Sequence, residues 1–317
     1  MTSLSRFTSR IGRVVAGAAL LGAASLAVAP AAGAMVNCGC RTAQADQTMV
    51  FASDRGAGMQ VFKADTNLTR VTQLTTGGAN SPSMNAARTL IAYVAPVNPR
   101  QALFVMNADG SGKRNVTNDP AHNYFSPSIS PDGTKAAVVS DRTGTPEIYV
   151  VTLSNGAVSQ LTFNTASDGR NWAPAWSPNG AYIAFTSNRG NVQNIYEMPS
   201  TGGSAQRVTY DGSADDAAWS PNSQEIAYTF VAPGALPEIY WADAFSVNVV
   251  HKVSTTDGNA HRDPSWSPDG SSIAFIATGQ IPTILAAGAN GGNQHTLISN
   301  GQQPNWGFPI QGPVAQQ

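Results

Sequence analysis

Short runs in which apolar and polar positions alternate follow one another along most of this chain. In residues 182–187, Ile183 and Phe185 share one face of a predicted strand and Ala184 lies on the other. The preceding Ser177-Pro178-Asn179-Gly180 has proline in the second place and glycine in the fourth, as a type I turn prefers. The full unit has four predicted strands, at residues 173–177, 182–187, 194–198 and 205–209. Short alternating strands separated by turn residues predict an all-β fold.

The same unit recurs along the chain. Its best copies begin at Pro174 and Pro264, where a proline is followed by a small residue and then by Trp-Ser-Pro-[Asn/Asp]-Gly-x-x-Ile-Ala-Phe. Weaker copies begin at Pro82, Pro127 and Ala217, and a truncated copy begins at Pro304. The starts lie 40 to 47 residues apart, a spacing typical of propeller blades.

The two ends of the repeated region complement each other. Residues 49–56 match a second strand and the loop after it, and no first strand precedes them. Residues 304–308 match a first strand with nothing after it. We therefore predict a six-bladed β-propeller with four antiparallel strands per blade, in which N- and C-terminal strands close the ring within one blade.

These motifs resemble a known family. The Trp-Ser-Pro-[Asp/Asn]-Gly repeat, the Ser-[Asp/Asn]-Arg-x-Gly loop and Asn107-Ala108-Asp109-Gly110-Ser111-Gly112 look like the TolB-type propeller repeat, over residues 47–308. The resemblance implies the propeller fold. It leaves function open, because such propellers occur in a periplasmic Tol–Pal component, in peptidase accessory domains and in pectate-degrading lyases. The chain shows no counterpart of the TolB N-terminal domain, so the resemblance does not predict a Tol–Pal role.

The first 34 residues read as a signal peptide. Basic Arg6, Arg10 and Arg13 precede an apolar run at residues 14–29, and Ala32-Gly33-Ala34 fits a small-residue cleavage site. A membrane anchor is the alternative, but the run is shorter than the ~20 residues of a spanning helix. We predict cleavage near Ala34 and an extracytoplasmic protein, periplasmic or secreted, with no stable membrane span.

The rest of the chain divides into three parts. A flexible linker is expected at 35–46, the propeller at 47–308 and a C-terminal tail at 309–317. Both cysteines, Cys38 and Cys40, fall in the linker. Asn37 before Cys38 argues against a lipoprotein anchor, and a single intervening residue strains a disulfide. The role of the two thiols stays open.

The charge balance limits the possible partners. Only 12% of the residues are charged and the formal net charge is -1, which argues against nucleic acid as a partner. We expect a monomer that binds a protein, a peptide or a cell-envelope component.

The candidate site lies in the connections between each fourth strand and the next first strand. In a propeller these connections gather at one mouth of the central channel, and variable loops on a fixed scaffold commonly carry function. The candidate ligand-binding residues are His122, Tyr124, Arg170, Asn171, Trp172, Asp215, Asp216, His261, Arg262 and Asp263.

No catalytic motif accompanies these residues. The chain has neither Gly-x-Ser-x-Gly nor His-Glu-x-x-His, and no cofactor is expected. We therefore predict a binding module and not an enzyme. The alternative is a metal-assisted polysaccharide lyase or hydrolase that uses His122 and His261 at the channel mouth, since imidazole and carboxylate suit several divalent ions.

The tryptophans separate into two groups. Four of them, Trp176, Trp219, Trp266 and Trp306, occupy the repeated position. Met84 and Ile129 replace them in the first two copies, so we predict that this position packs between blades. Trp172 and Trp241 lie outside this register.

Overall fold

A computed structural model describes residues 47–55, 58–65, 67–164, 169–210, 213–246 and 250–307. The predicted signal peptide, the linker with its two cysteines, and residues 308–317 lie outside the described residues. Within the described ranges the fold is all-β, and no helix there is long and apolar enough to cross a membrane.

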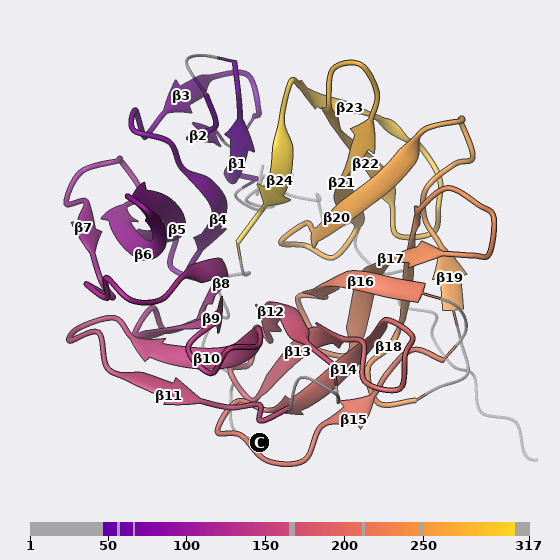
Figure 1. Ribbon diagram of the computed structural model, residues 1–317. Helices are drawn as coiled ribbons and strands as arrows, with labels where there is room; N and C mark the ends of the chain where they lie inside the picture. The colour runs from indigo at the N-terminus through magenta and orange to yellow at the C-terminus, as the bar shows by residue number, and fades with distance from the viewer. Residues whose placement is uncertain are drawn as a thin grey trace, which may run out of the picture. The chain divides into compact units, whose positions relative to one another are not determined.

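The strands form six four-stranded antiparallel sheets, which confirms the predicted six-bladed propeller (Figure 1). We number the blades in chain order, each from its innermost strand outward. Blade 1 contains β24 (Gln302–Asn305), β1 (Met49–Ser53), β2 (Gln60–Ala64) and β3 (Val71–Gln73). Blade 2 contains β4 (Asn80–Met84), β5 (Leu90–Val97), β6 (Arg100–Asn107) and β7 (Arg114–Asn115). Blade 3 contains β8 (Tyr124–Ile129), β9 (Lys135–Ser140), β10 (Glu147–Thr152) and β11 (Val158–Gln160).

The remaining blades repeat the same order. Blade 4 contains β12 (Asn171–Trp176), β13 (Tyr182–Ser187), β14 (Asn194–Pro199) and β15 (Gln206–Arg207). Blade 5 contains β16 (Ser213–Trp219), β17 (Glu225–Val231), β18 (Glu238–Asp243) and β19 (Val250–Lys252). Blade 6 contains β20 (Ala260–Trp266), β21 (Ser272–Thr278), β22 (Thr283–Gly288) and β23 (His295–Ser299).

The ring closes in blade 1, as the truncated repeat predicted. Strand β24 pairs antiparallel with β1, with Asn305 opposite Val50 and Gln302 opposite Ala52. In Figure 1 the yellow β24 lies beside the indigo β1. Closure covers the inner edge of β1, which would otherwise expose unpaired backbone groups.

Every innermost strand carries a β-bulge. At its centre one non-glycine residue adopts a left-handed backbone with φ between 46° and 54°. These six residues are Ser81, Ser126, Ala173, Asp216, Asp263 and Gln303. All but Asp216 precede a proline. A bulge inserts an extra residue and re-aims the chain, so the strands continue upstream of the prolines where simple alternation breaks down.

The bulges correct one expectation from the sequence. Eight of the ten candidate residues, all except His122 and Arg170, belong to the first strands and not to the loops before them.

The repeated tryptophans pack between neighbouring blades. Trp176, Trp219, Trp266 and Trp306 are between 2% and 7% exposed, and Met84 and Ile129 are fully buried at the same position. The position is therefore filled by bulky apolar side chains.

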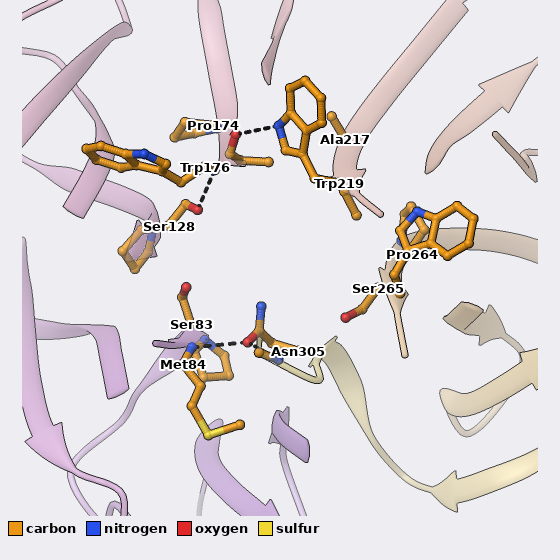
Figure 2. A pocket seen from close by; sticks show the side chains of 16 residues that line it. Ser83, Met84, Ser128, Pro174, Trp176, Ala217, Trp219, Pro264, Ser265 and Asn305 are labelled. Carbon is orange, nitrogen blue, oxygen red and sulfur yellow. Dashed lines mark hydrogen bonds between the residues drawn. The ribbon is translucent and has the colours of Figure 1, made fainter. Parts of the chain in front are cut away.

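Hydrogen bonds also join neighbouring blades at this level, and Figure 2 draws those from Trp176 to Ser128 and from Met84 to Asn305. At four of the six junctions, the side chain before the tryptophan position accepts the backbone N–H of the tryptophan position in the next blade. Ser83 accepts from Ile129, Ser128 from Trp176, Ser265 from Trp306 and Asn305 from Met84, over 2.8–3.1 Å. Ala175 and Ala218 hold the same place in blades 4 and 5 and offer no side-chain oxygen. At the junction after Ala175, the Trp219 indole N–H donates to the Ala175 carbonyl oxygen instead.

The arginines of the Ser-[Asp/Asn]-Arg loops stabilise individual blades. The Arg55 guanidinium lies 5.4 and 5.3 Å from the ring centroids of Phe51 and Phe62. Arg189 lies in the same way over Phe185 and Tyr196. Both also donate to oxygen acceptors of an adjacent strand or loop, which is a structural role.

Candidate functional site at the channel mouth

The inner strands surround a central channel. Its upper part is a cavity of about 160 Å³, lined by the six left-handed residues and the residue after each of them. Below it lies a second cavity of about 140 Å³, whose walls are shown in Figure 2. Five of the six residues after the left-handed ones are prolines, so most of the wall is rigid and offers no amide N–H there.

Three candidate residues occupy one equivalent buried position. Tyr124, Asn171 and His261 each begin or nearly begin an innermost strand and are fully buried. Asn171 Nδ2 donates to Glu147 at 2.8 Å, and His261 Nδ1 lies 2.9 Å from Glu238. These two carboxylates also accept hydrogen bonds from Thr162 and Ser254 at the ends of the fourth strands. The three side chains therefore fix the base of the mouth and do not face the channel's solvent.

Asp119 organises the loop before β8. Its carboxylate lies 2.9 Å from His122 Nδ1 and 2.8 Å from the Tyr124 hydroxyl, which donates to it. Arg142 donates to the same hydroxyl at 2.9 Å. Partial burial opposes ionisation of Asp119, but the bonds from His122, the Ala121 N–H and Tyr124 outweigh it and lower its pKa to about 2. The side chain of His122 stays about one-third exposed.

Trp172 and Asp215 form a bridge between blades 4 and 5. The indole N–H of Trp172 donates to Asp215 Oδ1 at 2.9 Å, and Thr186 Oγ1 donates to the same oxygen at 2.8 Å. Both residues are partly exposed. At the same register, blade 3 presents Phe125, which is 40% exposed, and blade 6 presents the exposed Arg262. Sequence analysis did not select Phe125, although its place four residues before Ile129 matches that of Trp172 before Trp176.

Asp216 and Asp263 face each other as the two acidic members of the left-handed set. Burial in the channel wall raises the pKa of Asp216 well above its usual value, and the negative charges of Asp263 and Asp215 raise it further. Burial also raises the pKa of Asp263. The two carboxyl groups are hydrogen-bonded to each other, an arrangement that requires a proton between them.

The two histidines of the lyase alternative are not brought together. His122 precedes β8 in blade 3 and His261 lies in blade 6, and blades three apart face each other across a six-membered ring (Figure 1). His261 is buried between Glu238 and Asp257. No group of three or more His, Cys, Asp or Glu side chains among the described residues is arranged to hold a metal ion.

Arg170 completes the set. It is exposed in the segment that leads into β12, and its backbone N–H donates to Asn188 Oδ1 at 2.6 Å. The mouth thus presents the aromatic side chains Phe125 and Trp172 from blades 3 and 4. Blades 5 and 6 present three carboxyl groups and the exposed Arg262.

The architecture is that of a closed six-bladed β-propeller whose channel mouth varies from blade to blade. The family model described as PD40, TolB beta propeller domain, matches residues 79–310. The chain belongs to this TolB β-propeller family.

Relatives of known identity agree on the fold. The Tol-Pal system protein TolB of Shigella flexneri is 42% identical over 79 residues, which are 24% of this chain and 18% of that protein. The crystal structure of TolB from Acinetobacter baumannii aligns with a TM-score of 0.69 and 21% identity, over 82% of this chain and 66% of that one. An oligogalacturonate lyase in complex with manganese aligns with a TM-score of 0.57 and 16% identity, over 80% of this chain and 74% of that one. The chain thus spans less than two thirds of the Shigella flexneri and Acinetobacter baumannii TolB proteins, and the structural likenesses show the fold alone.

Proposed function

We propose that this chain is an extracytoplasmic binding module that docks a protein or peptide at the channel mouth. The family supports a protein-binding propeller, and the predicted signal peptide supports an extracytoplasmic location. A monomeric state remains part of the proposal.

The observation that carries the proposal is the composition of the mouth. Phe125 and Trp172 expose aromatic surface on one side, and Asp215, Asp216 and Asp263 place carboxyl groups on the other. A tryptophan that a hydrogen bond holds in place, as Trp172 is, belongs to the residue types that dominate binding energies at protein interfaces. A partner segment with an apolar side chain next to a basic or amide group would satisfy both sides.

The test uses the purified chain as bait in cell-envelope extracts, with crosslinking and mass spectrometry to locate the contact. Phe125→Ala and Trp172→Ala should each reduce recovery of the crosslinked partner severalfold without lowering the melting temperature by more than a few degrees. Phe245→Ala provides the matched control, because Phe245 is 50% exposed but packs on Trp219 at the other end of its blade. Crosslinks that map away from the mouth, or equal loss in the control, would disprove the proposal.

A further inference from the structure

A pocket at the junction of blades 5 and 6 lies at the other end of the blades from the mouth. It has a volume of about 300 Å³, at the lower limit of small-ligand sites. Blade 5 contributes Asn222, Glu225 and Trp241, and blade 6 contributes Trp266, Asp269 and Ala289. We call it the junction pocket.

Two indole rings form one wall of the junction pocket. Trp241 and Trp266 meet edge to face, with centroids 6.1 Å apart and planes at 61°. Trp241 is fixed because its N–H donates to the Ala289 carbonyl oxygen at 2.8 Å. Trp266 is 7% exposed, and its buried indole N–H has no acceptor among the described residues. The other blades carry lysine, valine, glutamate or alanine where blade 5 has Trp241, so the tryptophan pair is particular to this junction.

The polar groups of the junction pocket are acidic. Glu225 Oε2 accepts from Ser220 Oγ at 2.6 Å, and Asp269 Oδ1 accepts from Ser267 Oγ at 2.6 Å and from the Ser271 N–H at 3.0 Å. Asp269 Oδ2 accepts no hydrogen bond within the part of the chain that the structure describes. Burial opposes ionisation of Asp269, but the hydrogen bonds from Ser267 and Ser271 outweigh it and lower its pKa. The lining contains two carboxyl groups and no lysine or arginine. The His251 ring, which is not part of the lining, stacks on Trp241 with ring centroids 4.0 Å apart.

Elsewhere in the chain, two guanidinium groups lie over pairs of aromatic rings. Arg55 and Arg189 each lie over a pair of aromatic rings while donating to oxygen acceptors. A guanidinium suits this role because it is planar, permanently charged and carries five donors. Tryptophan is the best aromatic partner for a cation.

We propose that the junction pocket binds the guanidinium group of an arginine residue in a partner polypeptide. The guanidinium would donate to Glu225 and Asp269 and contact the indoles. The pocket is separate from the channel mouth and does not depend on the function proposed for it.

The test titrates the full chain with N-acetyl-L-arginine methylamide, followed by NMR of the tryptophan indole N–H signals. Capped lysine and capped citrulline serve as comparison ligands, because citrulline keeps the shape of arginine and lacks its charge. Arginine should bind more tightly than lysine, citrulline should not bind, and added salt should weaken arginine binding. Glu225→Gln and Asp269→Asn should each weaken it about tenfold, the size of one charge-assisted hydrogen bond.

The controls separate binding from folding. Asp269→Asn keeps the turn, since Asn179 and Asn222 hold the same place in blades 4 and 5 and accept equivalent bonds. Asp132→Asn removes the same charge from the corresponding turn of blade 3 and should leave binding unchanged. Trp172→Ala should also leave it unchanged, which distinguishes this pocket from the mouth. Equal affinity for citrulline, no saturable binding of arginine, or undiminished binding by both acidic variants would overturn the proposal.

Discussion

Asn305 provides a direct test of how the ring is closed. Its side-chain oxygen accepts the backbone N–H of Met84 and that of Gly307, both at 3.0 Å, and so ties the closing strand β24 to blade 2. Met84 is fully buried. Asn305→Ala removes the acceptor and leaves a buried N–H unpaired, which costs about 1–3 kcal/mol. For a ring of this size, we expect the melting temperature to fall by roughly 5 °C.

Asn305→Ser is the matched control for this prediction. Serine holds the same place at three other junctions and accepts the same kind of N–H there. We expect the serine variant to retain at least half of the lost stability in calorimetry and in urea unfolding. If alanine and serine lower the melting temperature equally, or if neither does, the junction bond does not hold the ring closed and the reasoning is wrong.

Three further predictions concern buried groups. Burial raises the pKa of Glu197 to about 7. The free-energy cost of holding its ionised carboxylate in the folded protein is therefore absent below pH 4.5 and grows as the pH rises through 7. Glu197→Gln should therefore stabilise the fold by roughly 2–3 kcal/mol at pH 8 and little at pH 4, and a pH-independent effect in urea unfolding would contradict this. Asp216 also has a raised pKa, so Asp216→Asn should raise the melting temperature at pH 7.5 more than at pH 4. Asparagine is chosen because it tolerates the left-handed backbone at this position. A lower melting temperature at both pH values would count against the carboxyl pair. Ala218→Ser should offer the backbone N–H of Trp266 the hydroxyl acceptor that Ser128 and Ser265 give to Trp176 and Trp306, and add up to about 1 kcal/mol, measured by chemical denaturation. No gain would show that the two backbones lie too far apart.

The architecture could be predicted because its determinants are local and repeated. Turn sequences such as Ser177-Pro178-Asn179-Gly180 and the alternation in residues 182–187 each specify a hairpin by themselves, and β13 runs from Tyr182 to Ser187. When the six copies are aligned, the N-terminal copy lacks a first strand and the C-terminal end of the repeats supplies an extra one. This predicted the pairing of β24 with β1.

The sequence predicted a group of candidate residues but not how each of them is placed. The bulge at Ala173 shifts the alternation upstream of Pro174, so Asn171 and Trp172 read as loop residues although they belong to β12. The burial of Asn171 depends on Glu147, a partner 24 residues earlier on another blade. Such a pairing has no signature in a single sequence. The ligand-binding role of the exposed candidates remains a prediction.

The junction between blades 5 and 6 differs from the others in what holds it together. Ala218 offers no hydroxyl to the next blade, and the Trp266 indole finds no acceptor among the described residues. Hydrogen bonds that join these two blades are made elsewhere, for example from Trp241 to the Ala289 carbonyl oxygen and between His261 and Glu238. In the layer of the repeated tryptophans, amide exchange should therefore be fastest at this seam. A ligand that binds both Glu225 and Asp269 would reach across the same seam. Its binding would therefore stabilise the closed ring against opening.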